Sequence, residues 1–296
     1  MKILITGALG NVGRGIIGRL QNAGHDLVLY DVNRPPDDET FRGIPFVQGD
    51  IQAGIGLERA AHGCDAIVHT PAWHGIHWGS KTEADFWRLN VDGTVWMFQA
   101  AQALGIKRVV FLSSTAWYGQ YDKYGFTKRI GEELCEYNRR NYKIRYVSVR
   151  PNDFTPWGDD YCRYGSRLLY GGVDREDVLD CVALAVEKLV PELADGAEAE
   201  GIIAHALRAN AYTAEQIADW DADPLAAVEQ IFPGSRELVE KYNIGIKYKP
   251  GLSNLGEGEA AIGYAPTRHF GTFIEDLRRI DAEGGETAVR AIRCPY

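Results

Sequence analysis

The chain has 296 residues and a formal net charge of −9, which argues against nucleic acid as a partner. Hydrophobic residues make up 45% of it, enough for one large domain or a large domain with a small lobe, and no apolar run approaches the ~18 residues of a membrane span. It opens on a strand-like run instead of a secretory signal, and its five cysteines lack metal-type spacing, so we expect reduced thiols in a cytoplasmic protein.

The first element is a short apolar, β-branched run at residues 2–6, which predicts a buried strand. A Gly-x-x-Gly-x-x-Gly turn and a helix-like stretch follow it. Glycines at such a turn let the backbone approach a pyrophosphate, and the helix N-terminus then faces the anion. The spacing is not the usual Gly-x-Gly-x-x-Gly, so a turn without a ligand is the alternative. The predicted cofactor-binding residues of this turn are Gly7, Gly10, Asn11, Val12 and Gly13.

The second strand, residues 26–31, ends in a carboxylate, Asp31. A carboxylate at about this distance from the turn binds the adenosine ribose hydroxyls of NAD and repels the 2′-phosphate of NADP. Arg34 lies shortly after it and would suit that phosphate instead. NAD is the predicted cofactor, and Arg34 keeps the alternative open.

Strand-like and helix-like stretches alternate along the rest of the chain, which predicts an α/β fold. We expect a Rossmann-like doubly wound parallel sheet with a small C-terminal substrate lobe. The predicted strands are residues 2–6, 26–31, 45–49, 65–70, 107–112 and 144–149, with a further candidate at 201–206.

The two longest predicted helices cover residues 82–104 and 124–141. The dinucleotide-binding domain is expected at residues 1–155, with 174–206 returning to it. Residues 156–296 are expected to form mainly the substrate-covering lobe, with its closing helices at 255–264 and 269–279.

Tyr124 and Lys128 lie one turn apart on the same face of the second long helix. A phenol is too weak an acid to serve as a base at neutral pH, but a nearby ammonium lowers its pKa. The pair is therefore a candidate for moving the proton of an alcohol or carbonyl. Chance also produces Tyr-x-x-x-Lys in many helices, so the pair needs the hydroxyls of residues 113–115, just upstream, to support it.

These residues resemble an extended short-chain dehydrogenase/reductase of the NAD-dependent epimerase/dehydratase family. The resemblance is specific from residue 1 to about residue 155. Further matching segments are Gly49-Asp50-Ile51, Ala66 to Ala72, Asn90-Val91-Asp92-Gly93-Thr94, Phe111 to Gly119 and Arg150-Pro151.

The resemblance implies a role for each matching residue. Tyr124 would be the acid/base, and Lys128 would depress its pKa and bind the nicotinamide ribose. Ser114, with Thr115 as a second choice, would hold the substrate oxygen. Asn90 would orient Lys128 through a backbone carbonyl and a water. Besides Tyr124 and Lys128, the implied cofactor contacts outside the glycine turn are Asp50, Ile51, Thr70, Pro71 and Ala72.

Two segments are shorter than in nucleotide-sugar epimerases: the loop from Ser114 to Tyr124, and the stretch between Trp157 and Val173. This reduces the usual nucleotide platform and favours a small free substrate. Indole faces suit the C–H side of a sugar ring, while His and Asn reach its hydroxyls. The expected pocket residues are Trp73, His74, His77, Trp78, Ser114, Thr115, Trp117, Tyr118, Asn152 and Trp157. No Cys or carboxylate cluster accompanies His74 and His77, so no metal is expected.

The leading expectation is an NAD-dependent dehydrogenase or reductase acting on a sugar, sugar acid or similar small polyol. The alternative is a (nucleotide-)sugar epimerase or dehydratase that retains its cofactor. A non-enzymatic dinucleotide sensor would not need Ser, Tyr and Lys together. A homodimer through the two long helices is also expected from the apolar side chains of residues 82–104, unless these are buried within the subunit. Those side chains are Phe86, Leu89, Val95, Phe98 and Ala101.

Overall fold

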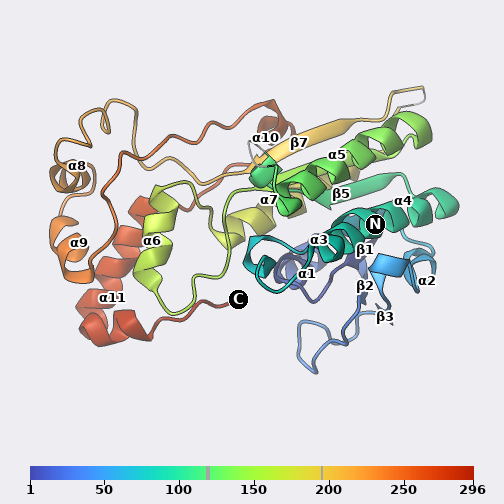
Figure 1. Cartoon of the computed structure of the whole chain (residues 1–296), viewed down its shortest axis with the longest axis horizontal. Helices are drawn as coiled ribbons and strands as arrows, with labels where there is room; N and C mark the ends of the chain where they lie inside the picture. Colours follow the sequence, from blue (N-terminus) through green and yellow to red (C-terminus); the bar gives the residue numbers. More distant parts are fainter. Residues whose placement is uncertain (118–120, 195) are drawn as a thin grey trace. The chain divides into compact units, whose positions relative to one another are not determined.

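A computed structural model describes residues 1–117, 121–194 and 196–296, without the Trp117 side chain. Tyr118 and the Trp117 side chain, both expected in the pocket, therefore lie outside the described part. The chain divides into two compact units (Figure 1). Unit 1 comprises residues 1–150, 179–205 and 256–264, and unit 2 comprises 151–178, 206–255 and 265–296.

Unit 1 is built around a seven-stranded sheet in the order β3-β2-β1-β4-β5-β6-β7. The strands are β1 Lys2–Thr6, β2 Asp26–Asp31, β3 Phe46–Gln48, β4 Ala66–His69, β5 Arg108–Leu112, β6 Arg145–Pro151 and β7 Gly201–Ala206. The pairs from β3 to β6 are parallel. Tyr146 and Asn152 donate to the carbonyls of Glu200 and Ala206, at the same offset, so β7 is parallel to β6 too. The predicted strands and the doubly wound fold are confirmed.

The central strands are buried on both faces, as the strands of a parallel sheet must be when helices cover it. Ile3, Leu4 and Ile5 of β1 and Ile67 of β4 have no exposed surface. Because each of these runs is apolar throughout instead of alternating, the sequence pattern led to the correct strands.

Short and long helices connect the strands of unit 1. They are α1 Asn11–Asn22, η1 Ile51–Ala53, α2 Leu57–Ala61, η2 Gly75–His77, α3 Glu83–Phe86, η3 Trp87–Asp92, α4 Gly93–Leu104, η4 Thr115–Trp117, α5 Lys123–Tyr142 and α10 Glu257–Ile262, with α7 Arg175–Leu189 entering from unit 2. The predicted helix 82–104 is thus not one α-helix, because the π-helix η3 separates α3 from α4. Asp122 starts α5 by accepting the amides of Tyr124 and Gly125, both at 2.8 Å.

Helix α5 packs against β5 at very short range. A Cβ atom at Gly131 would lie 2.3 Å from the ring of Phe111, so only glycine allows this approach. The contact fixes α5, and with it Tyr124 and Lys128, against the strand that carries Ser114 at its carboxyl end.

Helix α10 differs from our expectation for residues 255–264, which placed them in the lobe. It belongs to unit 1, where a Cβ at Gly258 would lie 1.8 Å from the carbonyl oxygen of Ile203 in β7. The buried Glu259 accepts hydrogen bonds from the amide and the Nδ1 of His205. A strand-to-helix contact of this kind has no local sequence pattern.

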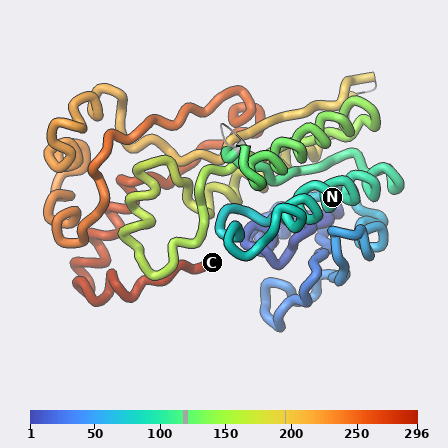
Figure 2. The backbone as a smooth tube through the Cα atoms, in the orientation of Figure 1, coloured from blue at the N-terminus to red at the C-terminus, as the bar shows by residue number. Residues whose placement is uncertain are grey.

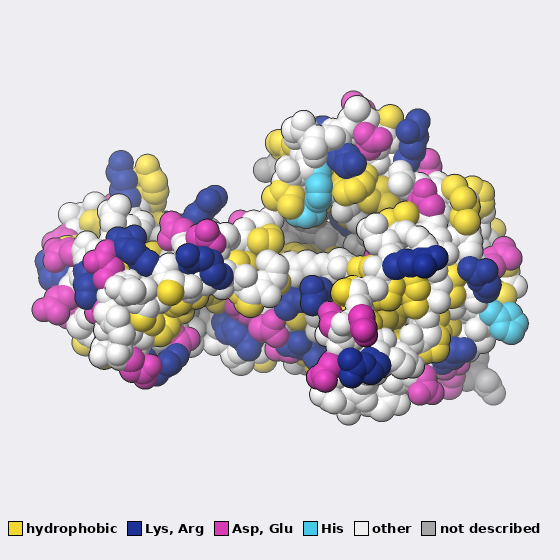
Figure 3. Space-filling view, turned by 90° about the horizontal axis from the view of Figure 1, so that it is seen from below, with side chains coloured by type: hydrophobic (Ala, Val, Ile, Leu, Met, Phe, Trp, Pro, Cys, Tyr) yellow, Lys and Arg dark blue, Asp and Glu magenta, His cyan; other side chains and the backbone are white. Residues whose placement is uncertain are grey.

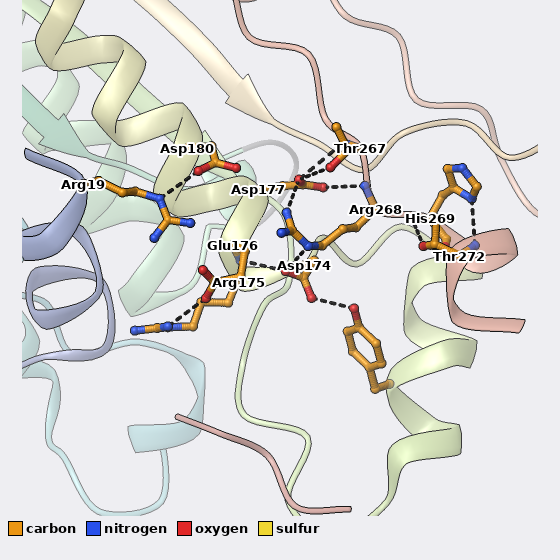
Figure 4. Close-up of polar contacts among 11 residues, drawn as sticks. Arg19, Asp174, Arg175, Glu176, Asp177, Asp180, Thr267, Arg268, His269 and Thr272 are labelled. Atoms are coloured by element: carbon orange, nitrogen blue, oxygen red, sulfur yellow. Dashed lines mark hydrogen bonds and ion pairs between the residues drawn. The ribbon is translucent and has the colours of Figure 1, made fainter. Parts of the chain in front are cut away.

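Unit 2 is mainly helical, and its helices can be traced by colour in the backbone view of Figure 2. They are α6 Tyr161–Leu169, α8 Pro224–Ile231, α9 Arg236–Tyr242 and α11 Phe270–Ala291, with the start of α7. Trp220, Phe270 and Phe273 fill its core. Asp177 of α7 holds the segment before α11, accepting the amide and Nη1 of Arg268 at 3.0 and 2.8 Å (Figure 4).

The apolar surface expected for dimerisation is largely used inside unit 1. Phe86, Phe98 and Ala101 are buried, while Leu89 and Val95 are half-buried. On the face shown in Figure 3, charged side chains of both signs alternate with small apolar groups. Within the described chain, no helix is long and apolar enough to cross a membrane.

Candidate functional site

The glycine turn between β1 and α1 is too crowded for side chains. The Gly10 amide donates to the Gly7 carbonyl at 3.0 Å, and a Cβ at Gly13 would lie 2.2 Å from that same carbonyl oxygen. Gly7 itself has a φ of 67°, which favours glycine. The Thr70 hydroxyl donates to the carbonyl of Thr6 at 2.8 Å and braces the turn from β4. The turn therefore exposes backbone, as close contact with a pyrophosphate requires.

Helix α1 starts immediately after this turn, with Gly10 as its N-cap and Asn11 as its first residue. Its first turn contains no acidic residue, so no side chain of the helix opposes an anion there. Val12, the second residue of α1, is buried. The predicted residues of the turn lie together, and the arrangement fits the pyrophosphate of a dinucleotide.

Asp31, at the end of β2, connects the glycine turn to the next loop. Its Oδ2 accepts the Leu9 amide at 3.1 Å, and its Oδ1 accepts the Asn33 amide at 3.0 Å. A carboxylate offers about four acceptor positions, so ribose hydroxyls can still bind. Arg34 points its Nε at Gln48 Oε1, 3.0 Å away. Arg34 is thus engaged with Gln48, and this agrees with NAD as the cofactor instead of NADP, whose 2′-phosphate Arg34 would otherwise suit.

The remaining predicted cofactor residues lie at the carboxyl ends of β3 and β4. Asp50 Oδ1 accepts the Gln52 amide at 2.9 Å and so caps η1, a local role besides the expected cofactor contact. Ile51 is buried. Pro71 and Ala72, directly after β4, are half-buried. These positions share the sheet edge with the glycine turn, where doubly wound folds bind ligands.

Asn90 is a buried bridge between the loop after β4 and helix α5. Its Oδ1 accepts the Trp73 amide at 2.8 Å, and its Nδ2 donates to the Trp73 carbonyl and to Thr127 Oγ1, both at 2.9 Å. Its carbonyl accepts the Thr94 hydroxyl at 2.7 Å. The expected orientation of Lys128 by Asn90, through a backbone carbonyl and a water, stays a prediction; the Asn90 side chain itself fixes Trp73 and Thr127. The π-helix η3 carries Asn90, and such segments often occur at functional sites.

Ser114 and Tyr124 are brought together as predicted. Burial raises the pKa of Tyr124 to about 12, although a hydrogen bond with the Ser114 side chain lowers it. The expected depression of this pKa by Lys128 is therefore not found, because burial outweighs the opposing effects. Ser114 Oγ also accepts the Ala116 amide at 3.1 Å, which fixes its direction. Thr115 is half-buried at the start of η4.

Lys128 is buried, and its ammonium donates to the Leu112 carbonyl at 2.6 Å. Burial lowers the pKa of Lys128 to about 7, and the negative charge of Glu132 opposes that fall. Glu132 accepts Arg150 Nε at 2.7 Å and Ser148 Oγ at 3.1 Å. This buried ion pair lies one helical turn from the lysine, so it forms part of the electrostatic surroundings of the site.

His69, the last residue of β4, was not among the predicted site residues. Its Nδ1 lies 2.9 Å from Thr6 Oγ1, and its Nε2 lies 3.2 Å from Thr94 Oγ1. Thr94 gives its own proton to the Asn90 carbonyl, so Nε2 donates to Thr94. The Thr6 hydroxyl lies closer to Nδ1 than to the Val68 carbonyl at 3.4 Å, so Nδ1 is assigned as the acceptor and the imidazole as neutral. Burial, and then the charge of Lys128, lower the pKa of His69 to about 3. The sequence feature that could have identified His69 is a histidine at the end of an otherwise apolar strand.

The aromatic loop after β4 lies beside Tyr124. The His74 ring is 6.3 Å from that of Tyr124, and His77 packs edge-on against both His74 and Trp73, at 4.6 and 4.8 Å. The Lys81 ammonium lies 4.2 Å over the Trp73 ring. The structure thus brings Trp73 and His74 into the site.

Three other predicted pocket residues have the following surroundings. Trp78 is 48% exposed, so its indole does not line an enclosed pocket. Trp157 is buried within unit 2 against Tyr161 and Tyr164, where it packs the lobe. Asn152, also in unit 2, donates to the Gly171 carbonyl at 2.7 Å. The described residues contain no group of three or more His, Cys, Asp or Glu that could hold a metal ion.

Comparisons with known proteins agree with this geometry. The family model described as NAD dependent epimerase/dehydratase family matches residues 3–158. A UDP-glucose 4-epimerase of Rhizobium leguminosarum bv. trifolii is 31% identical over 173 residues, 51% of this chain and 53% of that protein. The chain therefore spans about half the length of this curated relative.

Two solved structures share the fold at low identity. One, described as a mutated uronate dehydrogenase, has a TM-score of 0.62 at 19% identity and covers 99% of this chain and 94% of its own. The other, a UDP-glucuronic acid 4-epimerase from Bacillus cereus in complex with NAD, has a TM-score of 0.63 at 18% identity, with coverages of 94% and 99%. The predicted family, fold and cofactor are confirmed.

Proposed function

The chain belongs to the NAD-dependent epimerase/dehydratase family, and from that premise we propose that it is a (nucleotide-)sugar epimerase or dehydratase in which Tyr124 is the acid/base. The observation that carries the proposal is the hydrogen-bonded Ser114–Tyr124 pair, in the same unit as the glycine turn. This arrangement serves the oxidation and re-reduction of one sugar carbon. The match to epimerases supports it better than the dehydrogenase that we expected first.

The residues divide the work as follows. Ser114 holds the substrate oxygen, and Tyr124 takes its proton as the carbinol is oxidised and returns it when the carbonyl is reduced. NAD, when bound, supplies the acceptor and donor of the hydride. With its pKa raised to about 12, Tyr124 is protonated at neutral pH, as the reduction step requires. Lys128, once charged, favours the phenolate that the oxidation step requires.

The first test separates this function from a dehydrogenase. We expect the purified protein to retain NAD and to convert UDP-glucose or UDP-galactose without accumulating NADH, as followed by NMR and by the absorbance of reduced nicotinamide. Tyr124→Phe should lower turnover by about 10²–10⁴-fold. Tyr121→Phe, at a position that is 78% exposed, is the matched control and should leave turnover unchanged.

A dehydrogenase of sugar acids or polyols remains the second candidate. The full-length likeness to the structure described as a uronate dehydrogenase favours it, as do the two short segments after Ser114 and Trp157. Steady NADH production with a free sugar or sugar acid, together with loss of NAD during purification, would decide for this candidate and against the epimerase.

Cofactor choice provides a separate prediction. Asp31 should accept the ribose hydroxyls of NAD, so Asp31→Ala should weaken NAD binding by about tenfold or more, as expected for lost charge-assisted hydrogen bonds. The measurement is the dissociation constant of each cofactor by calorimetry. Asp26→Ala, at the exposed start of the same strand, is the control. Tighter binding of NADP than of NAD by the unaltered protein would contradict this role of Asp31.

A further inference from the structure

The hydroxyl of Thr127, a fully buried residue of α5, is engaged on two sides. Its Oγ1 lies 2.9 Å from the Tyr124 carbonyl and 3.0 Å from the Lys123 carbonyl. Threonines inside helices commonly donate to such carbonyls, so these contacts alone are ordinary. The same oxygen also accepts a hydrogen bond from Asn90, 37 residues earlier in the chain. Thr127 therefore connects the first turns of α5 to a separate element, the π-helix η3.

The direction of this hydrogen bond follows from the Trp73 backbone. The Trp73 amide can only donate, so the Asn90 atom that it meets at 2.8 Å is the oxygen, Oδ1. The other atom is then Nδ2, whose two protons go to the Trp73 carbonyl and to Thr127 Oγ1, both at 2.9 Å. The Thr127 hydroxyl thus accepts one proton from Asn90 and gives its own to a carbonyl of α5.

Asn90 holds Trp73 through both polar groups of its backbone, as a neighbouring strand would. Two hydrogen bonds to one residue fix its orientation as well as its place. Thr127 in turn fixes Asn90 to the helix that carries Tyr124. Because Asn90 and Thr127 are buried and their hydrogen bonds are satisfied, the link between Trp73 and Tyr124 is rigid.

This link sets the separation between the aromatic loop and Tyr124. His74 follows Trp73 directly, and its ring lies 6.3 Å from the Tyr124 ring. All of these residues belong to unit 1. A substrate that contacts the loop and reacts at Tyr124 needs both in fixed places, since a displacement of about 1 Å can lower the rate by about 10²-fold.

The hydrogen-bonded network extends from Asn90 to the glycine turn. The Thr94 hydroxyl donates to the Asn90 carbonyl at 2.7 Å, and His69 Nε2 lies 3.2 Å from the Thr94 oxygen. His69 Nδ1 lies 2.9 Å from the hydroxyl of Thr6, the residue before the turn. The positions of the glycine turn and of Tyr124 are thus both set relative to one buried residue, Asn90.

We infer that Thr127 is a positioning residue: through Asn90 it holds the loop after β4 at the separation from Tyr124 that turnover requires. The inference rests on the proposed function for the role of Tyr124 as acid/base. A threonine that only stabilised the fold would affect the free energy of unfolding and leave the turnover of the folded protein unchanged.

The test is Thr127→Val, which keeps the shape of the side chain and removes its hydroxyl. We expect kcat for UDP-galactose, measured on the full chain with NAD, to fall by about 10- to 100-fold, while the dissociation constant of NAD stays the same. Thr127→Ser, which keeps the hydroxyl, should restore most of kcat. Thr127→Ala removes the hydroxyl without placing a methyl beside the Asn90 amide, and it replaces the valine variant if that variant does not fold.

The matched control lies at the other end of α4 and α5. Gln102 Nε2 in α4 donates to Oδ1 of the buried Asn138 in α5, at 2.6 Å. Asn138 follows Tyr124 by fourteen residues, about 21 Å along the helix. Gln102→Met removes this link, so it should lower the free energy of unfolding without changing kcat. Equal kcat values for Thr127→Val and Gln102→Met would overturn the inference.

Hydrogen exchange of the Trp73 amide provides a measurement that does not need turnover. This amide donates to Asn90 Oδ1, so its exchange rate reports how firmly Asn90 is held. Thr127→Val should speed the exchange by about tenfold, as expected for the loss of one hydrogen bond, and Gln102→Met should leave it unchanged. An unchanged rate in Thr127→Val would contradict the link.

The outcomes separate this inference from the proposed function. Turnover that depends on Tyr124 but is unchanged in Thr127→Val would leave the proposed function standing and remove the inference. Faster exchange in Thr127→Val, in a protein that turns over no sugar, would remove the proposed function and support the hold of Thr127 on the loop.

Discussion

Lowering the pH should destabilise the protein through His69 in particular. An unfolded histidine has a pKa of about 6.5, whereas burial lowers the pKa of His69 to about 3 in the folded protein. Between these values the unfolded state binds a proton that the folded state does not, so stability falls as the pH falls. The slope is about 1.4 kcal/mol per pH unit, which gives a loss of about 2 kcal/mol between pH 6.5 and pH 5 from this residue alone.

The assay is urea denaturation at a series of pH values, for the unaltered protein and for His69→Gln, whose amide can still bond to both threonines. The free energy of unfolding of the unaltered protein should fall by about 2 kcal/mol more than that of the variant between pH 6.5 and pH 5. His62→Gln, at an exposed histidine, is the control and should follow the unaltered protein. Parallel curves for His69→Gln and the unaltered protein would refute the assignment of a buried, neutral imidazole.

Two further predictions concern close packing and buried charge. Gly13→Ala should weaken NAD binding at least tenfold, because its Cβ would overlap a carbonyl oxygen of the turn. The control is Gly18→Ala on the same helix, which has nothing within 4 Å and should bind NAD normally. Equal binding by the two variants would contradict the crowded turn. Glu132→Gln should lower the free energy of unfolding by about 3–5 kcal/mol, because it removes the charge that balances the buried Arg150. Chemical denaturation measures this loss, with the exposed Glu133→Gln as the control, and a loss below ~1 kcal/mol would show that the pair contributes little.

The sequence predicted the strands and the glycine turn because their patterns are local. An apolar β-branched run bounded by turn residues identifies a buried strand, and the spacing of Tyr124 and Lys128 identifies a shared helical face. The sequence could not predict the pKa of Tyr124. The expected effect depends on one neighbouring charge, whereas burial in the folded chain raises this pKa and outweighs the hydrogen bond with Ser114.

Two other features were missed for related reasons. The π-helix at residues 87–92 has no distinguishing composition, so the sequence pattern predicts one helix over residues 82–104. His69 lies in an apolar strand, where sequence alone does not reveal that threonines from two other elements meet both of its ring nitrogens. Both features depend on tertiary contacts.

The division of the chain has a consequence for its synthesis on the ribosome. Unit 1 is assembled from three separate stretches, and its last pieces, β7 and α10, end only at residue 264. A nascent chain that has emerged as far as β6 exposes that strand's unpaired edge, which can pair with other chains. The edge remains open until β7 has been made. A fragment ending near residue 155 would keep it open permanently, so it should aggregate instead of behaving as an independent cofactor-binding domain.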